Sequence, residues 1–383
     1  MIRSHPALTE EHEALRETMR RFVAREIAPH AAEWDEAETF PRELYTKAAA
    51  AGLLGIGFPE EYGGTPADLF THVILAEEIA LAGVGGVHAS LFSHQIGSPP
   101  VATAGSLELK ARVLPGVIAG EKISALAITE PGGGSDVAAL KTTARRDGAD
   151  YVVNGEKTFI TSGMRADFYT VAVRTGGPGA TGVSLLLIER EREGFTRTPL
   201  KKMGWWCSDT ATLHFDNVRV PAGNLVGEEN AGFRIIMRNF NAERLGMAAA
   251  AVGFAHACLD EAVNWARQRQ TFGKALIEHQ AIRHKLVDMQ TQVHAARAMV
   301  YDTAWKLEQT PRDPALVAQL AMTKNFAGRT MQFCADAAVQ TLGGAGFMRG
   351  TRCERIYREA KVYMIGGGAE EVMKDLASRQ LGW

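Results

Sequence analysis

The segment best suited to bind a ligand spans residues 126–136, where an apolar stretch runs into Gly132-Gly133-Gly134 and then Ser135-Asp136. Glycines have no Cβ, so their backbone can approach a ligand closely. The backbone N–H groups and the Ser135 hydroxyl could then donate hydrogen bonds to a cofactor or a phosphate. A strained turn between two strands explains the same pattern equally well, so the segment alone leaves both interpretations open.

Three further segments place glycine next to polar or aromatic side chains. Residues 159–163 are predicted to end a strand at Gly163. Residues 269–274 are predicted to end a helix at Gly273, an ordinary type of C-cap. Residues 340–346 form a glycine-rich exit from another helix. Each pattern alone is more often structural than functional, so shared chemistry depends on the elements that bring them together.

Residues 1–122, the first part of the chain, are predicted to be helical. Thr9 is a suitable N-cap for the first helix, whose apolar residues recur at spacings of three and four as far as Ile27. Pro29 is expected to end that helix. The later elements expected here are a helix ending at Gly52, a loop over residues 57–64 and helices near residues 71–82 and 107–119.

Residues 123–226 differ, because short runs rich in β-branched and aromatic residues replace the helical spacing. Asn154-Gly155 is expected to form a turn between two of these runs. The expected strands are residues 151–153, 157–161, 167–173, 183–188 and 211–215. This part of the chain is therefore predicted to form a small β-barrel-like domain.

Long alanine-rich helices with short connections return over residues 227–383. One helix carries Met247 and Ala266 on a single apolar face, and two more are predicted over residues 278–308 and 313–342. Such helices pack naturally as a four-helix bundle. The predicted fold class is α+β, with an N-terminal helical domain over residues 1–122, a middle β domain over 123–226 and a C-terminal helical bundle over 227–383.

The composition argues against several classes of partner. The chain of 383 residues has a net charge of −2, which gives no indication of a surface for nucleic acid or an anionic membrane. No apolar run approaches the roughly 20 residues that span a bilayer, and the N-terminus lacks a signal-peptide pattern. We therefore expect a soluble, cytoplasmic protein. Four widely spaced cysteines, expected to be buried thiols rather than metal ligands or disulfides, are Cys207, Cys258, Cys334 and Cys353.

In this order and spacing, the segments resemble the FAD-dependent acyl-CoA dehydrogenases. The resemblance covers nearly the whole chain, and residues 126–136 and 340–371 are its most specific parts. It implies FAD as cofactor, an acyl-CoA as substrate, an electron-transfer flavoprotein as acceptor and a homotetramer with FAD across a subunit interface. The implied reaction is α,β-dehydrogenation to the trans-2-enoyl-CoA, in which a carboxylate removes the α proton while the β hydride moves to flavin N5.

The same resemblance implies which residues contact the cofactor. The flavin ring and its ribityl chain are expected to lie against the glycine segment and the end of the predicted strand at residues 157–161. The adenine half and the subunit interface are expected to involve residues of the helical bundle. The cofactor-binding residues implied are Leu126, Ile128, Thr129, Gly134, Ser135, Phe159, Ile160, Thr161, Arg269, Phe272, Gln280, Gln340, Gly343, Gly344, Ala369 and Glu371.

The catalytic base is the point at which the chain departs from most of this family. Most relatives carry a glutamate within a Tyr-Glu-Gly-Thr stretch, but here the aligned residues are Gly366-Gly367-Gly368-Ala369. A minority, including isovaleryl-CoA dehydrogenase, carries the base on a helix that corresponds here to the one holding Glu243. We therefore predict Glu243 as the base. The resemblance implies substrate contacts for Ser135, Phe240, Asn241, Arg244, Gly367 and Gly368, with the Gly367 N–H on the thioester oxygen.

Two alternatives to a catalytic Glu243 remain open. Glu243 could be a carboxylate in the first turn of a helix, where the helix dipole favours negative charge. Glu370 or Glu371 could instead supply the base, because both follow the glycine segment directly.

The substrate is less well defined than the reaction. A base on the helix with glycine opposite leaves room near Cβ, so we expect a branched or medium-to-long acyl chain from fatty acid or branched-chain amino acid catabolism. The same scaffold also supports acyl-CoA oxidases, flavin monooxygenases and nitroalkane oxidases. A nucleic-acid-binding relative carries a basic extra domain, and this chain has neither the extra length nor the positive charge.

Overall fold

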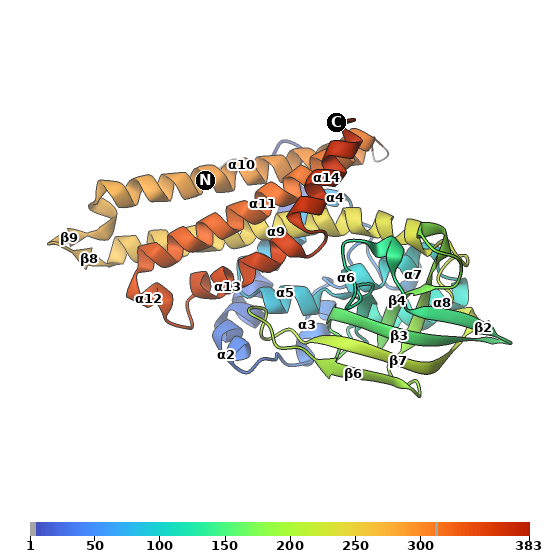
Figure 1. The fold of residues 1–383 in the computed structure, drawn as a ribbon. Helices are drawn as coiled ribbons and strands as arrows, with labels where there is room; N and C mark the ends of the chain where they lie inside the picture. Colours follow the sequence, from blue (N-terminus) through green and yellow to red (C-terminus); the bar gives the residue numbers. More distant parts are fainter. Residues whose placement is uncertain (1–4, 311–312) are drawn as a thin grey trace. The chain divides into compact units, whose positions relative to one another are not determined.

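The computed structural model describes residues 5–310 and 313–383, so the first four residues of the N-terminus considered above lie outside it. The chain forms two compact units. One unit contains the described parts of residues 1–36, 68–88 and 244–383, and the other contains residues 37–67 and 89–243. The predicted succession of a helical part, a curled sheet and a second helical part is confirmed (Figure 1).

The unit of residues 37–67 and 89–243 is built around a seven-stranded sheet in the order β1-β4-β2-β3-β7-β6, with β5 paired to β4. The strands are β1 Ser124–Ala127, β2 Thr143–Asp147, β3 Asp150–Thr161, β4 Phe168–Arg174, β5 Val183–Glu189, β6 Phe195–Pro199 and β7 Thr210–Pro221. Its helices include α3 Glu43–Ala50, α6 His94–Gly97, α7 Pro99–Ala104 and α8 Leu107–Ile118. Buried residues of α8 and β5 share one apolar core, which fixes the sheet against this helix.

One strand corrects the sequence prediction. Asn154-Gly155 is not a turn between two strands, because β3 runs continuously from Asp150 to Thr161. The pairing of β3 with β7 instead shifts in register between Val153 and Gly155. Gly155 has φ +140°, and a Cβ there would lie 2.7 Å from the Thr142 Cα. Glycine is therefore required at a bulge inside the strand, where it allows close approach of the neighbouring chain.

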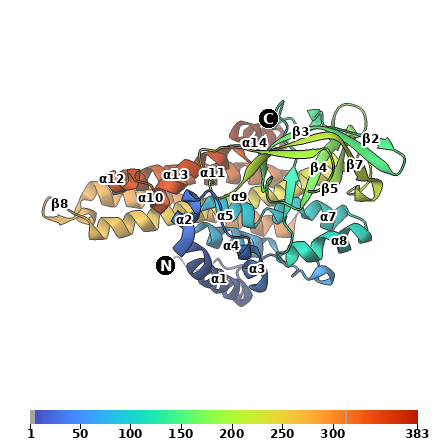
Figure 2. The same ribbon diagram turned by 90° about the horizontal axis from the view of Figure 1, so that it is seen from below.

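The other unit is helical (Figures 1 and 2). Its helix α11 packs against α10, α13 and α14, and α4 packs against both α1 and α10. Its elements are α1 Glu10–Phe22, α2 Ala31–Glu36, α4 Leu69–Ala80, the part of α9 from residue 244, α10 Gln280–Gln309, α11 Pro314–Leu342, α12 Gly344–Phe347, α13 Arg352–Ile365 and α14 Glu370–Gln380. Helix α9 as a whole runs Gly232–Gln268, and α5 spans Gly85–Leu91. The helices expected over 278–308 and 313–342 thus begin and end within two residues of α10 and α11.

The first helix begins where the sequence predicted but does not end at the predicted residue. The N-cap Thr9 is confirmed, because its side chain accepts a hydrogen bond from the His12 N–H. Pro29 does not end the helical path: π-helical residues Val23–Ile27 and a 3-10 turn at Ala28–His30 lead into α2. The ring of Pro29 falls at the start of that turn, where its missing N–H is tolerated.

Gly273 is also not a helix cap. Helix α9 ends at Gln268, and Gly273, with φ +80°, forms the turn between strands β8 Gln270–Thr271 and β9 Lys274–Ala275. The left-handed backbone required by this short hairpin explains the glycine. A helix C-cap and a hairpin turn both favour glycine at positive φ, so the glycine alone does not distinguish them.

Two further expectations concern the cysteines and membrane-spanning helices. All four cysteines are buried, as expected. Among the described residues, no helix is both long and apolar enough to cross a membrane.

Candidate functional site

The glycine segment after β1 forms an open loop. Glu130 and Gly133 exchange backbone hydrogen bonds, with N···O distances of 3.2 and 3.0 Å, and so close a tight turn. A Cβ built on Gly132 or Gly133 would meet nothing within 4 Å. Residues 131–136 are all exposed. The loop therefore exposes bare backbone and the Ser135 side chain, as a ligand-binding segment requires.

The end of β3 lies next to this loop. The Thr158 N–H donates to the Thr129 carbonyl oxygen at 2.8 Å. The pairing of β3 with β7 shifts between Lys157 and Ile160, and within this bulge Phe159 has φ +59°. A positive φ is uncommon for a bulky residue. It places the Phe159 ring on the surface, where 70% of the residue is exposed, so the structure brings two of the predicted cofactor-binding segments together.

These features fit a flavin. An exposed aromatic side chain offers a flat apolar surface for stacking, and the neighbouring glycine backbone can approach a planar ring closely. The N–H groups and hydroxyls nearby can donate to the polar edge of the ring and to its ribityl chain. The donor set therefore matches FAD, the cofactor that the resemblance implies.

A buried ion pair lies directly behind the loop. The Lys157 ammonium donates to Glu130 Oε1 at 2.8 Å and to the Ile128 carbonyl oxygen at 2.9 Å. The Glu130 carboxylate also accepts from the backbone N–H groups of Lys141 and Thr142, at 2.6 and 2.8 Å. Lys157 is 0% exposed. The ion pair thus ties the start of the glycine loop to β3 and to the residues just before β2.

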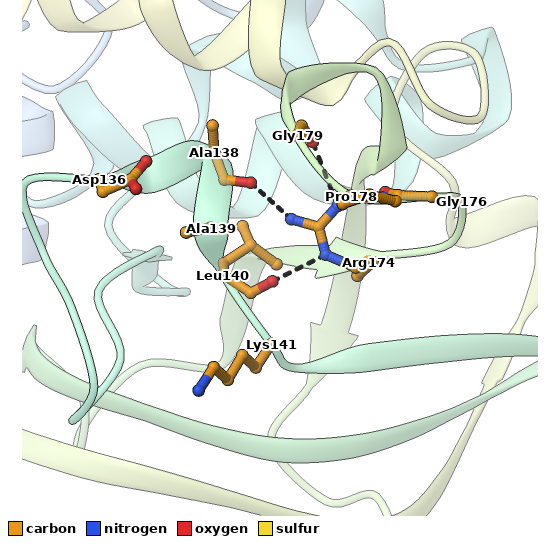
Figure 3. Close-up of a pocket in the computed structure, with 10 residues that line it drawn as sticks. Asp136, Ala138, Ala139, Leu140, Lys141, Arg174, Gly176, Pro178 and Gly179 are labelled. Carbon is orange, nitrogen blue, oxygen red and sulfur yellow. Dashed lines mark hydrogen bonds between the residues drawn. The ribbon is translucent and has the colours of Figure 1, made fainter.

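A cavity of about 610 Å³ continues from Asp136 along the same unit, between residues 136–141 and the glycine-rich residues 176–179. Figure 3 shows that the Arg174 guanidinium lies between these two walls. It donates to the carbonyl oxygens of Ala138 and Leu140 on one side and of Gly177 and Gly179 on the other. The exposed Lys141 side chain points away from this guanidinium (Figure 3). Arg174 therefore shapes the cavity, and Lys141 leaves a cation at its edge.

Helix α9 carries the predicted base. Since α9 begins at Gly232, Glu243 lies about three turns into the helix. The alternative interpretation of Glu243 as a first-turn carboxylate is therefore wrong. Phe240, Glu243 and Arg244 are three and four residues apart and share one side of the helix. Glu243 is half-buried and Arg244 is buried.

The second glycine segment links α13 to α14. Gly367 and Gly368 have φ values of +63° and +111°. The Gly367 carbonyl oxygen accepts from Arg244 Nε at 3.1 Å, and the Gly368 carbonyl oxygen accepts from Lys324 Nζ at 2.6 Å. In a planar trans peptide the next N–H points away from the carbonyl oxygen. The two buried cations therefore aim the N–H groups of Gly368 and Ala369 away from themselves.

The two glutamates after this loop are poorly suited to act as the base. Glu370 forms ion pairs with Arg329 and Lys374. Hydrogen bonds from these two cations lower the pKa of Glu370 to about 2, and a carboxylate with so low a pKa is a weak base. Glu370 is buried, but two cations occupy its carboxylate, and Glu371 faces solvent.

A third set of predicted cofactor-binding residues lies elsewhere. Arg269 and Phe272 follow the end of α9, and Phe272 is 98% exposed in the β8–β9 hairpin. Arg269 is separated from Arg244 by 25 residues of α9 and its end, which corresponds to roughly 37 Å along the helix axis. The β8–β9 hairpin and α12 lie at the same end of the helices (Figures 1 and 2). The exposed residues of this set are Arg269, Phe272, Gln280, Gln340, Gly343 and Gly344.

Sequence reasoning missed the cations and the acid that hold the loops. Glu130 and Pro131 precede the glycines, and Lys157 continues the alternate positions of the buried residues Tyr151 and Val153 in its strand. Lys324 lies in a helix whose neighbours on the same face, three and four residues away, are Leu320, Ala321, Ala327 and Gly328. A charged residue at a position that the apolar pattern assigns to the core would have identified Lys157 and Lys324.

Comparison with known proteins assigns every part of the chain to one family. The acyl-CoA dehydrogenase N-terminal domain model matches residues 9–121, the middle domain model residues 125–218 and the C-terminal domain model residues 230–382. These matches follow one another along the chain in the order of the helical, sheet and helical parts.

Individual relatives agree with this assignment. The mitochondrial long-chain specific acyl-CoA dehydrogenase of Sus scrofa is 39% identical, over 97% of this chain and 86% of the relative. The crystal structure of a probable acyl-CoA dehydrogenase from Mycobacterium abscessus is 49% identical with a TM-score of 0.95, over 98% and 99% of the two chains. A structure described as the electron transferring flavoprotein of Acidaminococcus fermentans is 34% identical with a TM-score of 0.93, over 98% and 99%.

Proposed function

Because the chain belongs to the acyl-CoA dehydrogenase family, we propose that it converts a branched or medium-to-long acyl-CoA to the trans-2-enoyl-CoA, with Glu243 as the base. Like other members it is an oxidoreductase that acts on an acyl-CoA. One observation carries the assignment of the base. Arg244, which directly follows Glu243 on α9, donates to the backbone of Gly367, the residue that replaces the usual glutamate. This contact supports a carboxylate that is supplied by the helix rather than by the loop.

The side chains divide the work of proton removal. The α C–H of a thioester is a weak acid, so its removal needs a basic carboxylate and donors for the negative charge that develops on the thioester oxygen. Glu243, which is half-buried on α9, takes the proton. Arg244 and Lys324 hold the carbonyl oxygens of the Gly366–Gly368 loop. The N–H groups of Gly368 and Ala369 are thereby kept in one orientation, next to the Gly367 N–H that is proposed to bind the oxygen.

FAD is held by the glycine loop and the bulge of β3. When bound, FAD would supply the acceptor for the hydride that leaves Cβ. Ile128, Thr129 and Ser135 contribute donors and acceptors on one side, and Phe159 contributes its exposed ring. Ile160 and Thr161, which pair with β7, fix the direction of the strand that carries this ring.

The distant set of exposed residues serves a second copy of the chain. Arg269 lies roughly 37 Å from Arg244 along α9, so it cannot join the site of Arg244 and Gly367 through its own helix. An exposed Phe272 and an exposed pair of glycines at residues 343–344 suit an interface. This separation supports a homotetramer in which each FAD contacts two subunits, as the family resemblance implies.

The cavity beside Ser135 suits the CoA part of the substrate. It is bordered by the exposed cation Lys141 and by backbone of residues 176–179, and the CoA nucleotide is polyanionic. The similarity to a long-chain specific enzyme supports an acyl chain at the longer end of the proposed range. The likeness to a structure described as an electron transferring flavoprotein supports that class of acceptor.

The test is anaerobic bleaching of the bound flavin by a panel of straight and branched acyl-CoA esters in stopped flow. Wild-type protein should be bleached by at least one ester. Glu243→Gln should retain FAD and lose the great majority of the rate, because the amide cannot accept the α proton. Glu370→Gln is the matched control and should keep a rate close to wild type.

Two outcomes would contradict the proposal. Near-normal bleaching of Glu243→Gln would remove Glu243 as the base, and loss of bleaching in Glu370→Gln alone would transfer the role to that residue. Turnover in air that produces stoichiometric hydrogen peroxide would instead indicate an acyl-CoA oxidase.

A further inference from the structure

We propose that the buried ion pair of Glu130 and Lys157 is a positioning device for the flavin, which fixes the backbone of the glycine loop and places a cation behind it. This inference rests on the proposed function, because it assumes that the loop holds FAD. It concerns two residues that are not expected to contact the cofactor themselves.

The pair controls the backbone on both sides of Thr129. Lys157 Nζ donates to the Ile128 carbonyl oxygen at 2.9 Å. Since carbonyl and N–H point in opposite directions within one peptide, this bond directs the Thr129 N–H away from Lys157. The Thr129 carbonyl oxygen accepts from the Thr158 N–H at 2.8 Å. Both peptide groups of Thr129 therefore have one orientation, which depends on Lys157 and on the β3 bulge.

Glu130 extends the same control to the far end of the loop. Its carboxylate accepts from the N–H groups of Lys141 and Thr142, while its backbone closes the turn with Gly133. A Cβ on Gly134 would lie 3.2 Å from the Thr129 Cγ2, so the loop folds back on Thr129. One carboxylate thus joins the beginning of the loop to the chain that follows it.

The burial of this pair is hard to explain by stability alone. Lys157 is 0% exposed and Glu130 is 8% exposed, and removing two charges from water costs about as much as their attraction returns. Burial lowers the pKa of Lys157 to about 8, although Glu130 opposes the shift. The cation is therefore kept at neutral pH at an energetic cost, which points to a role in the site.

A buried cation also affects the chemistry of a cofactor held in front of it. Reduction adds negative charge to a flavin, and charge in the surrounding protein tunes its electronics. In a medium of low dielectric constant such an interaction is much stronger than in water. Lys157 should therefore favour the reduced flavin, while Glu130 moderates the effect.

The experiment compares the FAD affinity and the flavin midpoint potential of the purified holoenzyme with those of three variants. Lys157→Met removes the cation, and Glu130→Gln/Lys157→Met removes both charges. Tyr151→Phe is the control, because it removes a 2.8 Å hydrogen bond to Glu229 from the same strand β3 without touching the loop. Thermal unfolding of each apoprotein measures any general loss of stability.

Lys157→Met should shift the equilibrium of flavin reduction at least tenfold towards the oxidised form, or about 30 mV for two electrons. It should also weaken FAD binding at least tenfold. The double variant should return the potential to within threefold of wild type in equilibrium constant, yet keep the weakened binding, because the bond to Ile128 is still absent. Tyr151→Phe should change neither quantity.

A folded Lys157→Met protein with wild-type potential and FAD affinity would overturn the inference. Equal losses in Tyr151→Phe would also overturn it, because they would reveal a general effect of destabilising β3. The double variant leaves no unpaired buried charge. If Lys157→Met does not fold, the FAD affinity of the double variant is the test, and wild-type affinity would overturn the inference. Failure of wild-type protein to bind FAD would instead refute the proposed function.

Discussion

The two glycine loops of the protein are held by opposite arrangements of charge. At residues 130–134, the loop contributes a carboxylate, Glu130, which accepts from Lys157 and from backbone N–H groups. At residues 366–368, the loop contributes only carbonyl oxygens, and Arg244 and Lys324 donate to them. Buried cations thus donate hydrogen bonds to both loops, but only the first loop includes a carboxylate that balances the charge of its cation.

Their glycines also serve different purposes. Gly132 and Gly133 have open space where a Cβ would stand, so glycine there leaves room for a ligand. Gly368 has φ +111°, and its Cβ would lie 2.4 Å from the Met373 Cε. Glycine is therefore needed there because other residues rarely adopt this backbone conformation. The glycines of the first loop leave room for a ligand, and those of the second allow the backbone to hold two peptide groups in a fixed direction.

Arg244→Lys should produce the largest effect among tests of this contrast. Lysine keeps the charge but lacks the planar donor group of arginine, so the Gly367 carbonyl loses its fixed position. If the second loop positions donors for the thioester oxygen, acyl-CoA-dependent flavin bleaching in stopped flow should slow about 10²-fold. FAD content should stay normal, because the first loop is intact.

The matched control for that variant is Arg329→Gln, which removes a partner of Glu370 just beyond the same loop. It should leave the bleaching rate within a few-fold of wild type. An unchanged rate in Arg244→Lys, or an equal loss in both variants, would mean that the second loop does not depend on its carbonyl contacts.

A pair of glycine substitutions tests the contrast at the level of stability. Gly368→Ala should lower the free energy of unfolding by about 1–3 kcal/mol, because alanine is strained at positive φ. Gly133→Ala should change it by less than about 0.5 kcal/mol, yet weaken FAD binding. Chemical denaturation and FAD titration of both variants provide the measurements. Equal destabilisation by the two substitutions would show that the glycines are equivalent.

The sequence predicted the elements of the fold better than the details of either loop. Apolar spacing placed α10 and α11 to within two residues, because long helices repeat the same signal many times. Asn154-Gly155 was wrongly predicted as a turn, since a glycine bulge and a glycine turn look alike when the partner strand is unknown. The neighbouring β7, far along the chain, decides between them.

The functional residues were predictable to the extent that a family motif contained them. Glu243 and Gly367 could be proposed together from the resemblance, whereas the contacts of Lys157 and Lys324 could not be predicted. The role of a buried lysine depends on which carbonyl oxygen it reaches, and both lysines reach residues well separated from them in the chain. Local patterns carry no information about such long-range contacts.

The last test concerns the helix that leads into the second loop. On α13, Glu359 accepts from the Gly85 N–H at 2.9 Å and is 1% exposed. Burial, together with the nearby Asp35, raises the pKa of Glu359 from 4.5 to about 8, although Arg355 and Arg358 oppose the shift. Behind the first loop, burial lowers the pKa of Lys157 from 10.5 to about 8. Burial therefore brings the pKa values of Glu359 and Lys157 to about the same pH, by raising the first and lowering the second.

The signs of the resulting pH dependences are opposite. Between pH 4.5 and 8 the folded state keeps the Glu359 proton and the unfolded state releases it, so the free energy of unfolding falls as pH rises. Between pH 8 and 10.5 the unfolded state keeps the Lys157 proton and the folded state releases it, so this contribution rises with pH. Glu359→Gln should flatten only the first dependence, by up to about 1.4 kcal/mol per pH unit. Urea denaturation at intervals from pH 5 to 9 measures both, and an unchanged slope below pH 8 in Glu359→Gln would show that Glu359 is already ionised in the folded protein.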